Sequence, residues 1–228
     1  MNRYQDNYGV IDSKIYNKIH QQVILIVGLG GLGGYLANGF ARLGVKKIIL
    51  VDHDRFETKN LNRQLFSTSE NLKRFKVSIV KEAIDSINPN VEVTAIEHQV
   101  QSIEDHHFIG VDWIVDAVDD IETKCYLEAL CHRFNKPLLH GAIGGWFGQI
   151  GIIESHRRIL KQLYERKQNG AEMSQKSPTF IPGVVAHMML AEWVKYHINK
   201  HNSLTNSILF IDLFHHKYQT MHFETEVF

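Results

Sequence analysis

Five glycines within seven residues, set between an apolar run and a helical pattern, restrict the fold more than any other feature. Residues 23–27 read VILIV, which is typical of a strand buried on both faces of a parallel sheet. GLGGLGG occupies 28–34, and apolar residues then recur with helical spacing from 32 to 43. Glycines let the backbone turn tightly and approach a phosphate, which the N–H groups of a helix N-terminus can bind. The sequence thus predicts a strand, a nucleotide-binding turn and a helix.

Strand and helix patterns continue to alternate through the first half of the chain. The further predicted strands are 47–51, 91–96, 113–118 and 137–140. The further predicted helices cover about 77–87, which Asn88-Pro89 ends, and 122–134. Such alternation with short connections predicts an α/β fold with a doubly wound, Rossmann-like and mostly parallel sheet.

The second half has a different pattern. Residues 149–154 predict a strand, and Pro182 begins a predicted C-terminal helix that runs to about residue 200. Two more predicted strands, 208–214 and 218–224, are close enough in sequence to pair as an antiparallel hairpin. Residues 155–178 are polar and basic without a clear period, so we expect a long loop there.

Composition narrows the range of partners and locations. Lysine plus arginine and aspartate plus glutamate each total 25, so no whole-surface field draws the chain to nucleic acid or anionic lipid. No apolar run approaches the ~18–20 residues that cross a bilayer, and the N-terminal residues lack the hydrophobic segment of a signal peptide. We therefore expect a cytoplasmic protein with no membrane partner, and one domain over residues 1–228.

Polar side chains that suit a nucleotide triphosphate follow the second predicted strand. Asp52 ends that strand about twenty residues after the glycines, where it can accept hydrogen bonds from a ribose hydroxyl. Asn60, Arg63, Gln64 and Lys76 come next, and such a cluster can neutralise the charge that grows on a leaving pyrophosphate. The segment taken alone is also compatible with a solvated polar loop.

Three carboxylates lie at the end of the fourth predicted strand, in the sequence DAVDD at 116–120. Ligands of open α/β sheets bind beyond the carboxyl ends of the strands. A carboxylate such as Asp119 can hold Mg²⁺ against phosphate oxygens there. Asp120 is a second candidate, although it can equally cap the helix that follows.

In order and spacing these motifs resemble the ThiF/MoeB/HesA family of ubiquitin-activating-type adenylyltransferases. The resemblance is carried by GLGGLGG, DHD at 52–54, NLNRQ at 60–64, Lys76 and DAVDD. It continues through HGA at 140–142, GQI at 148–150 and IPGV at 181–184, and so covers nearly the whole chain.

The resemblance implies that a carboxylate attacks the α-phosphate of ATP, giving an acyl-adenylate and pyrophosphate. The implied substrate is the C-terminal glycine of a ubiquitin-like sulfur carrier protein of the ThiS/MoaD type with a Gly-Gly tail, and the implied pathway is thiamine biosynthesis. It also implies a homodimer, a nucleotide-binding half at 1–140, and a substrate-binding and dimerisation half at 141–228 with a crossover loop at 155–178.

Individual residues acquire roles from the same resemblance. Arg63, Lys76 and Asp119 would be catalytic, and Mg²⁺ would bind Asp119, with Asp120 as the second candidate. The residues implied to contact ATP are Gly28, Gly30, Gly31, Leu32, Gly33, Asp52, Asp54, Asn60, Arg63, Gln64 and Lys76.

The chain also departs from the family pattern in several ways. It lacks the Cys-x-x-Cys pairs of zinc-binding members, so we expect no zinc. No cysteine occurs within 155–182, so chemistry should stop at the adenylate or pass to another protein. Asp6 occupies the position of an arginine that reaches the partner subunit's ATP in some members, which leaves Arg3 as a substitute. Asp120 replaces the usual asparagine.

Other functions remain open on the sequence. The carboxylate could belong to the threonylcarbamoyl group of a tRNA adenosine or to a small peptide. The basic residues of the 155–176 segment would then contact tRNA phosphates: His156, Arg157, Arg158, Lys161, Arg166, Lys167 and Lys176. An NAD-dependent oxidoreductase would explain the glycines and Asp52 but not Lys76 or Asp119. An inactive binding scaffold is a further alternative.

Overall fold

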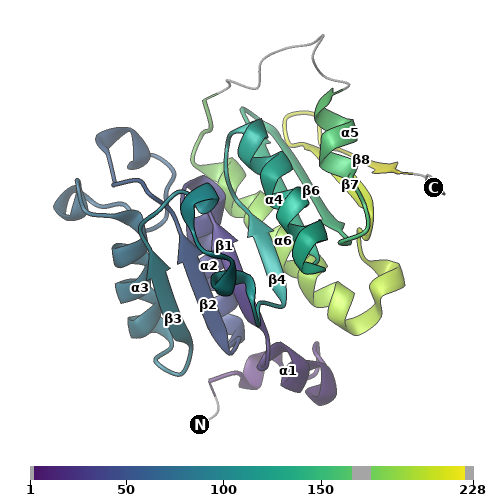
Figure 1. The fold of residues 1–228 in the computed structure, drawn as a ribbon, viewed down its shortest axis with the longest axis horizontal. Coiled ribbons are helices and arrows are strands. Elements are labelled where there is room, and N and C mark those ends of the chain that lie inside the picture. Colours follow the sequence, from purple (N-terminus) through teal and green to yellow (C-terminus); the bar gives the residue numbers. More distant parts are fainter. Residues whose placement is uncertain (1–2, 166–175, 224–228) are drawn as a thin grey trace.

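The computed structural model describes residues 3–165 and 176–223, in which eight strands form one sheet with helices on both faces (Figure 1). The strand order is β3-β2-β1-β4-β5-β6-β7-β8. The first five strands in the chain are mutually parallel and the last three are antiparallel to their neighbours. Their bounds are β1 Val23–Val27, β2 Lys47–Val51, β3 Glu92–Ile96, β4 Trp113–Asp116, β5 Leu138–Gly144, β6 Phe147–Ile153, β7 Ser207–Asp212 and β8 Lys217–His222. The predicted fold class is confirmed.

Helices cover both faces because the central strands are apolar on both sides. The α-helices are α1 Ser13–Ile19, α2 Gly31–Leu43, α3 Lys76–Ile87, α4 Ile121–Phe134, α5 Ile159–Glu165 and α6 Phe180–Asn199. Along β1, Ile24 and Ile26 pack in a cluster with α2, α3 and α6. Leu25 and Val27 point the other way, into a cluster with α4 and α5. Among the described residues, no helix has both the length and the apolar character needed to cross a bilayer.

Residues 155–178 are not simply a loop, and here the sequence-based prediction is wrong in part. Ile159–Glu165 forms α5, which buries Ile159, Leu160, Leu163 and Tyr164 against the sheet. The helix is too short for its period to stand out among basic neighbours, and most of its stability comes from packing. The remainder of the predicted loop, 166–175, lies outside the described residues.

Several element boundaries also differ from the prediction. α1 was not predicted, although Asp12 caps it by accepting a hydrogen bond from the Lys14 amide at 2.7 Å. β4 ends at Asp116, two residues early, because the chain turns there. β5 continues to Gly144, where a tight turn lets it pair with β6. The predicted hairpin of the last two strands is confirmed.

The strand order determines where a ligand can bind. β1 lies between β2 and β4, so the connections after β1 and after β4 leave the sheet in opposite directions. This reversal opens a crevice outside the carboxyl ends of β1 and β4. The glycine-rich turn follows β1, Asp116 ends β4, and Asp119 and Asp120 follow β4. Both predicted nucleotide motifs therefore lie at the same edge of the sheet.

Candidate nucleotide-binding site

The glycine-rich turn between β1 and α2 packs directly on the end of β4. Gly28 has a φ of 87°, and a Cβ atom built on it would lie 2.7 Å from the carbonyl oxygen of Ala117. A Cβ on Gly33 would lie 1.9 Å from the Gly28 carbonyl oxygen. Only glycine fits these two positions. The turn therefore brings the N-terminus of α2 to this edge of the sheet, and within the described residues no side-chain hydrogen bond caps it at Gly30.

Asp52 holds the glycine-rich turn from the neighbouring strand. Its Oδ2 accepts a hydrogen bond from the Leu29 amide at 2.6 Å, and its Oδ1 accepts one from the Asp54 amide at 2.8 Å. The carboxylate is buried at the end of β2. Each oxygen retains a second lone pair, which can accept a ligand hydroxyl.

Lys76 places a buried positive charge beside this carboxylate. Its Nζ lies 2.8 Å from Asp54 Oδ2 and 4.0 Å from Asp52 Oδ2, while its side chain is 6% exposed. Burial alone would raise the pKa of the Asp54 carboxyl, but the hydrogen bond and charge of Lys76 outweigh burial and lower it. The Asp54 side chain is 54% exposed, so an anionic ligand can compete with it for the ammonium group.

The NLNRQ segment contributes groups with different surroundings. Asn60 is buried, and its Oδ1 accepts from the Glu57 amide at 2.8 Å within a capping box, which is a structural role. Gln64 is buried against the glycine turn: a Cβ on Gly30 would lie 3.6 Å from its Nε2. Among the described residues, Gln64 Oε1 has no hydrogen-bond partner. A buried acceptor without a donor is costly, so it marks a place for a ligand hydroxyl or amino group.

The remaining residues of the predicted site have different surroundings. Arg63 donates to the carbonyl of Lys59 at 3.2 Å and to Asn62 Oδ1 at 3.0 Å, and it is partly exposed. Leu32 is buried in the core, so only its backbone can face a ligand. Gly31 adjoins the second half of the chain, since a Cβ there would lie 3.3 Å from Pro182.

The two candidate metal ligands after β4 have different structural roles. Asp120 Oδ1 accepts from the Thr123 amide at 2.7 Å and caps α4, as one of the two sequence-based interpretations proposed. Asp119 is exposed two residues beyond Ala117, the residue that contacts the glycine turn. Oxygen or nitrogen atoms of Asp52, His53 and Asp54 also lie within 4.8 Å of one another. The two carboxylates of that group already bind backbone amides and Lys76, so Asp119 has the more available oxygens.

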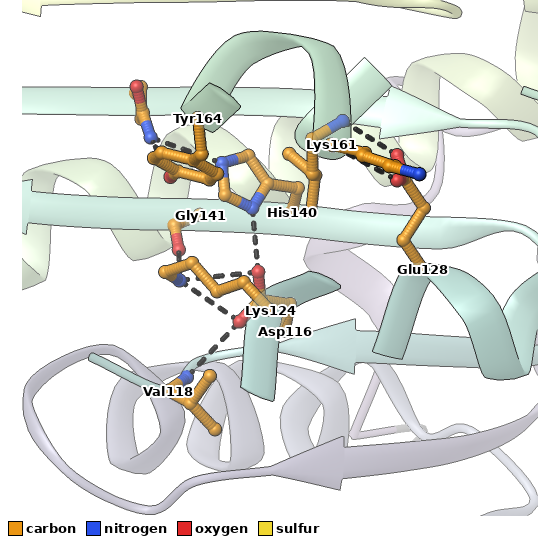
Figure 2. Close-up of polar contacts among 10 residues, drawn as sticks. Asp116, Val118, Lys124, Glu128, His140, Gly141, Lys161 and Tyr164 are labelled. Atoms are coloured by element: carbon orange, nitrogen blue, oxygen red, sulfur yellow. Dashed lines mark hydrogen bonds and ion pairs between the residues drawn. The ribbon is translucent and has the colours of Figure 1, made fainter. Parts of the chain in front are cut away.

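A buried polar network, shown in Figure 2, surrounds Asp116 at the end of β4. It was not predicted from the sequence. Asp116, at the end of β4, accepts from Lys124 Nζ at 3.0 and 3.2 Å and from the Val118 amide at 3.2 Å. Lys124, from α4, also donates to the Gly141 carbonyl at 2.9 Å. Burial alone would raise the pKa of Asp116, but the charge of Lys124 and the hydrogen bond from His140 hold it below its ordinary value. The signal was an aspartate inside an apolar strand, which needs a buried cation nearby.

The network continues from Asp116 across β5 and β6 to α5. Burial lowers the pKa of His140, whose neutral ring donates from Nδ1 to Asp116 Oδ2 at 2.6 Å. Gln149 Nε2 lies 3.3 Å from His140 Nε2 and donates to the Tyr164 hydroxyl at 2.5 Å. These contacts connect the end of β4 to α5 through four buried side chains, of which Asp116, His140 and Tyr164 are labelled in Figure 2.

Arg3, the suggested substitute for the missing arginine, is bound within its own chain. It donates to the Ile87 carbonyl at 3.1 Å and to Asn88 Oδ1 at 2.7 Å. These acceptors lie at the end of α3, whose first residue is Lys76, so the helix separates them from the site by about 18 Å. In this protomer Arg3 is a structural residue.

Comparison with known proteins identifies the family. The model of the ThiF family matches residues 4–226. The chain belongs to the ThiF family.

Individual relatives show different substrates for this family. The chain is 27% identical over 207 residues to the SAMP-activating enzyme E1 of Haloferax volcanii, covering 89% of the chain and 77% of that protein. It is 34% identical over 145 residues to the tRNA threonylcarbamoyladenosine dehydratase of Escherichia coli, covering 63% of the chain and 52% of that protein. The chain spans only 19% and 24% of the length of two larger eukaryotic activating enzymes that it matches.

A solved structure supports the fold independently. The crystal structure of Escherichia coli MccB with ATP aligns with a TM-score of 0.80 and 20% sequence identity. The alignment covers 100% of this chain and 73% of that one. The likeness extends over the parallel and the antiparallel parts of the sheet.

Proposed function

We propose that the chain activates a carboxylate with ATP and Mg²⁺, forming an acyl-adenylate and releasing pyrophosphate. The observation that carries this proposal is the buried Lys76 ammonium beside the glycine-rich turn that leads into α2. A dinucleotide would use the turn and Asp52, but it would give Lys76, which Asp54 holds at the site, no role in the reaction. Membership of the ThiF family and the fold shared with ATP-bound MccB support the same function.

The residues present fit a nucleotide triphosphate. The α2 N–H groups and Lys76 would bind phosphate oxygens, and Asp52 would accept from the ribose. The unpartnered Gln64 Oε1 offers one more acceptor in the same cradle. Asp119 would hold Mg²⁺, which supplies charge neutralisation of the triphosphate when bound. We assign Arg63 to the same phosphates, since it follows the buried Asn60 and precedes Gln64.

The reaction needs positioning and charge rather than acid–base chemistry. A carboxylate oxygen forms a bond to the α-phosphorus while the bond from that phosphorus to the bridging oxygen breaks. The electron pair leaves with pyrophosphate, and no proton is transferred. Lys76 and Arg63 would stabilise the negative charge on the departing oxygens, which is the main requirement of phosphoryl and nucleotidyl transfer.

We propose a polypeptide carrier with a Gly-Gly tail as the substrate. Its support is a group of exposed aromatic side chains at the carboxyl edge of the sheet, here called the aromatic surface: Trp146, Phe180 and Phe214. The ring of Trp146 lies 4.4 Å from that of Phe180 and 5.4 Å from that of Phe214, and the three are 37–60% exposed. An exposed aromatic group beside a site is typical of a protein-binding surface. A further relative, the ubiquitin-like modifier-activating enzyme 1 of Homo sapiens, is named for a ubiquitin-like substrate, which supports the same choice.

The proposal is tested by isotope exchange between pyrophosphate and ATP. We expect exchange when a ubiquitin-like protein ending in Gly-Gly is added, and none when its tail is deleted. Asp119→Ala should abolish exchange, because loss of one such contact reduces rates by about two to three orders of magnitude. ATP with Mg²⁺, but not NAD, should raise the Tm. Stabilisation by NAD alone would contradict the proposal.

A second substrate class has a specific observation in its favour. The threonylcarbamoyladenosine dehydratase is the relative with 34% identity, which supports a modified tRNA as the source of the carboxylate. Exchange that requires tRNA carrying this base, and not the carrier protein, would select it. Basic residues near α5 would then contact RNA, and binding would weaken steeply with salt. We further propose that the chain acts as a cytoplasmic homodimer, to be tested by sedimentation.

A further inference from the structure

The end of β4 is fixed by buried contacts that lie outside the proposed nucleotide site. Asp116 Oδ1 accepts from the Val118 amide at 3.2 Å and from Lys124 at 3.0 Å, while Oδ2 binds Lys124 and His140. Asp116 is fully buried and Lys124 is 2% exposed. Val118 immediately precedes Asp119. The buried carboxylate therefore determines the course of the backbone that carries the exposed one.

We propose that Lys124 is a positioning residue for the metal, acting through Asp116 and the Val118 amide on Asp119. This inference rests on the proposed function, in which Asp119 holds Mg²⁺. Lys124 binds both oxygens of Asp116 and the Gly141 carbonyl of β5, so one ammonium group joins the end of β4 to the middle of β5. Its charge prevents the Asp116 side chain from rotating away from the turn.

Stability alone does not explain a charged pair at this position. Two buried ions lose their hydration, and a well-packed apolar pair of similar volume is commonly as stable. What an apolar pair cannot do is accept a hydrogen bond from the Val118 amide. Groups that hold a metal ligand in place typically change metal affinity about 10–100-fold when removed.

The test measures binding rather than turnover. The affinity of the non-hydrolysable α,β-methylene analogue of ATP is determined by calorimetry with Mg²⁺ and again with EDTA. The ratio of the two affinities is the Mg²⁺ coupling. We expect Lys124→Met to lower this ratio about 10-fold or more, with the affinity in EDTA unchanged. A role confined to stability would lower the Tm and leave the ratio as it is.

Glu128→Gln is the matched control variant. Glu128 is a buried ionisable residue four positions further along α4, but it binds the amides of Leu160 and Lys161 at the start of α5 (Figure 2). We expect it to lower the Tm and keep the wild-type coupling. Asp119→Asn sets the ratio to expect when the metal ligand itself is lost.

A double variant shows whether Lys124 acts through Asp119. In the Lys124→Met/Asp119→Asn protein, the coupling should be no lower than with Asp119→Asn alone, because the two effects share one route. If Lys124→Met does not melt cooperatively, Lys124→Met/Asp116→Leu replaces it, since that pair leaves no uncompensated charge and removes the acceptor of the Val118 amide. We expect its coupling to fall about 10-fold or more, as with Lys124→Met.

The outcomes separate the two proposals. A folded Lys124→Met or Lys124→Met/Asp116→Leu protein with wild-type coupling would overturn the positioning role and leave the proposed function intact. Additive effects in the Lys124→Met/Asp119→Asn protein would also overturn it. A wild-type protein that binds the analogue equally well with and without Mg²⁺ would overturn the metal-dependent function itself, together with this inference.

Discussion

At the scale of single residues, the site is built from side chains and glycines whose surroundings leave little freedom. Gly28 fits against the Ala117 carbonyl, Asp52 receives two backbone amides, and Lys76 is buried with an exposed counter-ion. Each of these was identified from its position in the sequence. Their hydrogen bonds could not be, because they depend on how β1, β2 and β4 align.

Gly28→Ala should lower the free energy of unfolding by more than the backbone conformation of Gly28 alone explains. A φ of 87° costs a side chain about 1 kcal/mol, and the new Cβ would also meet the Ala117 carbonyl at 2.7 Å. Gly110→Ala is the control, because Gly110 has a φ of 78° and open space around it. We expect urea unfolding to show a loss at least about 1 kcal/mol larger for Gly28→Ala, with weaker ATP binding. Equal losses would contradict the close approach.

His197 should make the protein sensitive to acid. Burial, aided by the charge of Lys18 and opposed by Asp112, lowers the pKa of His197 from 6.5 to about 4. Its ring packs on Trp193 with centroids 4.5 Å apart, and among the described residues its Nε2 has no hydrogen-bond partner. The folded state therefore favours the neutral ring. Its contribution to stability is present above pH 6.5 and is lost as the pH falls toward 4.

Replacing this ring should reduce the acid sensitivity. With His197→Phe, the fall in Tm between about pH 6.5 and 4.5 should shrink by about 2–4 °C, the effect of roughly 1 kcal/mol in a chain of this size. The exposed His98 provides the control, and His98→Phe should keep the wild-type pH dependence. The same pH dependence in wild type and His197→Phe would refute the assignment.

At the scale of elements, the sequence predicts what depends on local pattern and misses what depends on partners. The strands and long helices were visible in their apolar periods, and α2, α3 and α6 begin within two residues of expectation. α5 was missed because its seven residues are anchored from another helix. The network of Asp116, Lys124 and His140 was missed for the same reason, since its members come from β4, α4 and β5.

Glu128→Gln should loosen α5 while leaving α4 in place. The Glu128 carboxylate accepts from the Leu160 amide at 2.6 Å and the Lys161 amide at 3.2 Å, whereas a glutamine can accept only one of them through its single oxygen. A loss of about 1–2 kcal/mol corresponds to a roughly 5–30-fold rise in local opening. Hydrogen exchange of amides 160–164 measures it, with α4 amides as the internal reference. Unchanged protection of α5 would show that packing alone anchors it.

At the scale of the whole molecule, one edge of the sheet carries both proposed activities. The glycine turn follows β1, Asp119 follows β4, and the aromatic surface begins in the turn after β5. Because these strands are parallel neighbours, their carboxyl ends meet at the same edge. The proposed nucleotide site and the proposed carrier site are therefore adjacent but use separate residues.

Variants of the aromatic surface should impair use of the carrier without impairing ATP binding. Trp146→Ser combined with Phe214→Ser should raise the carrier concentration needed for half-maximal exchange about 10-fold or more, because aromatic anchors commonly contribute 1–2 kcal/mol or more each. The ATP affinity and the Tm should stay at wild-type values. Ile109→Ser, which changes a side chain that is 74% exposed, is the control and should leave carrier use unchanged. Loss of ATP binding in the aromatic variant would contradict the separation.

The tight turn between β5 and β6 fixes how far a carrier's tail must reach. Trp146 lies in the turn between β5 and β6, and β6 is two strands along the sheet from β4. Neighbouring strands lie about 4.8 Å apart, so the lateral gap is at most about 10 Å. An extended peptide advances about 3.3 Å per residue, and three or four residues bridge that gap. A carrier whose ordered body rests on the aromatic rings would thus need only a short free end, and shortening that end by two residues should separate docking from reaction.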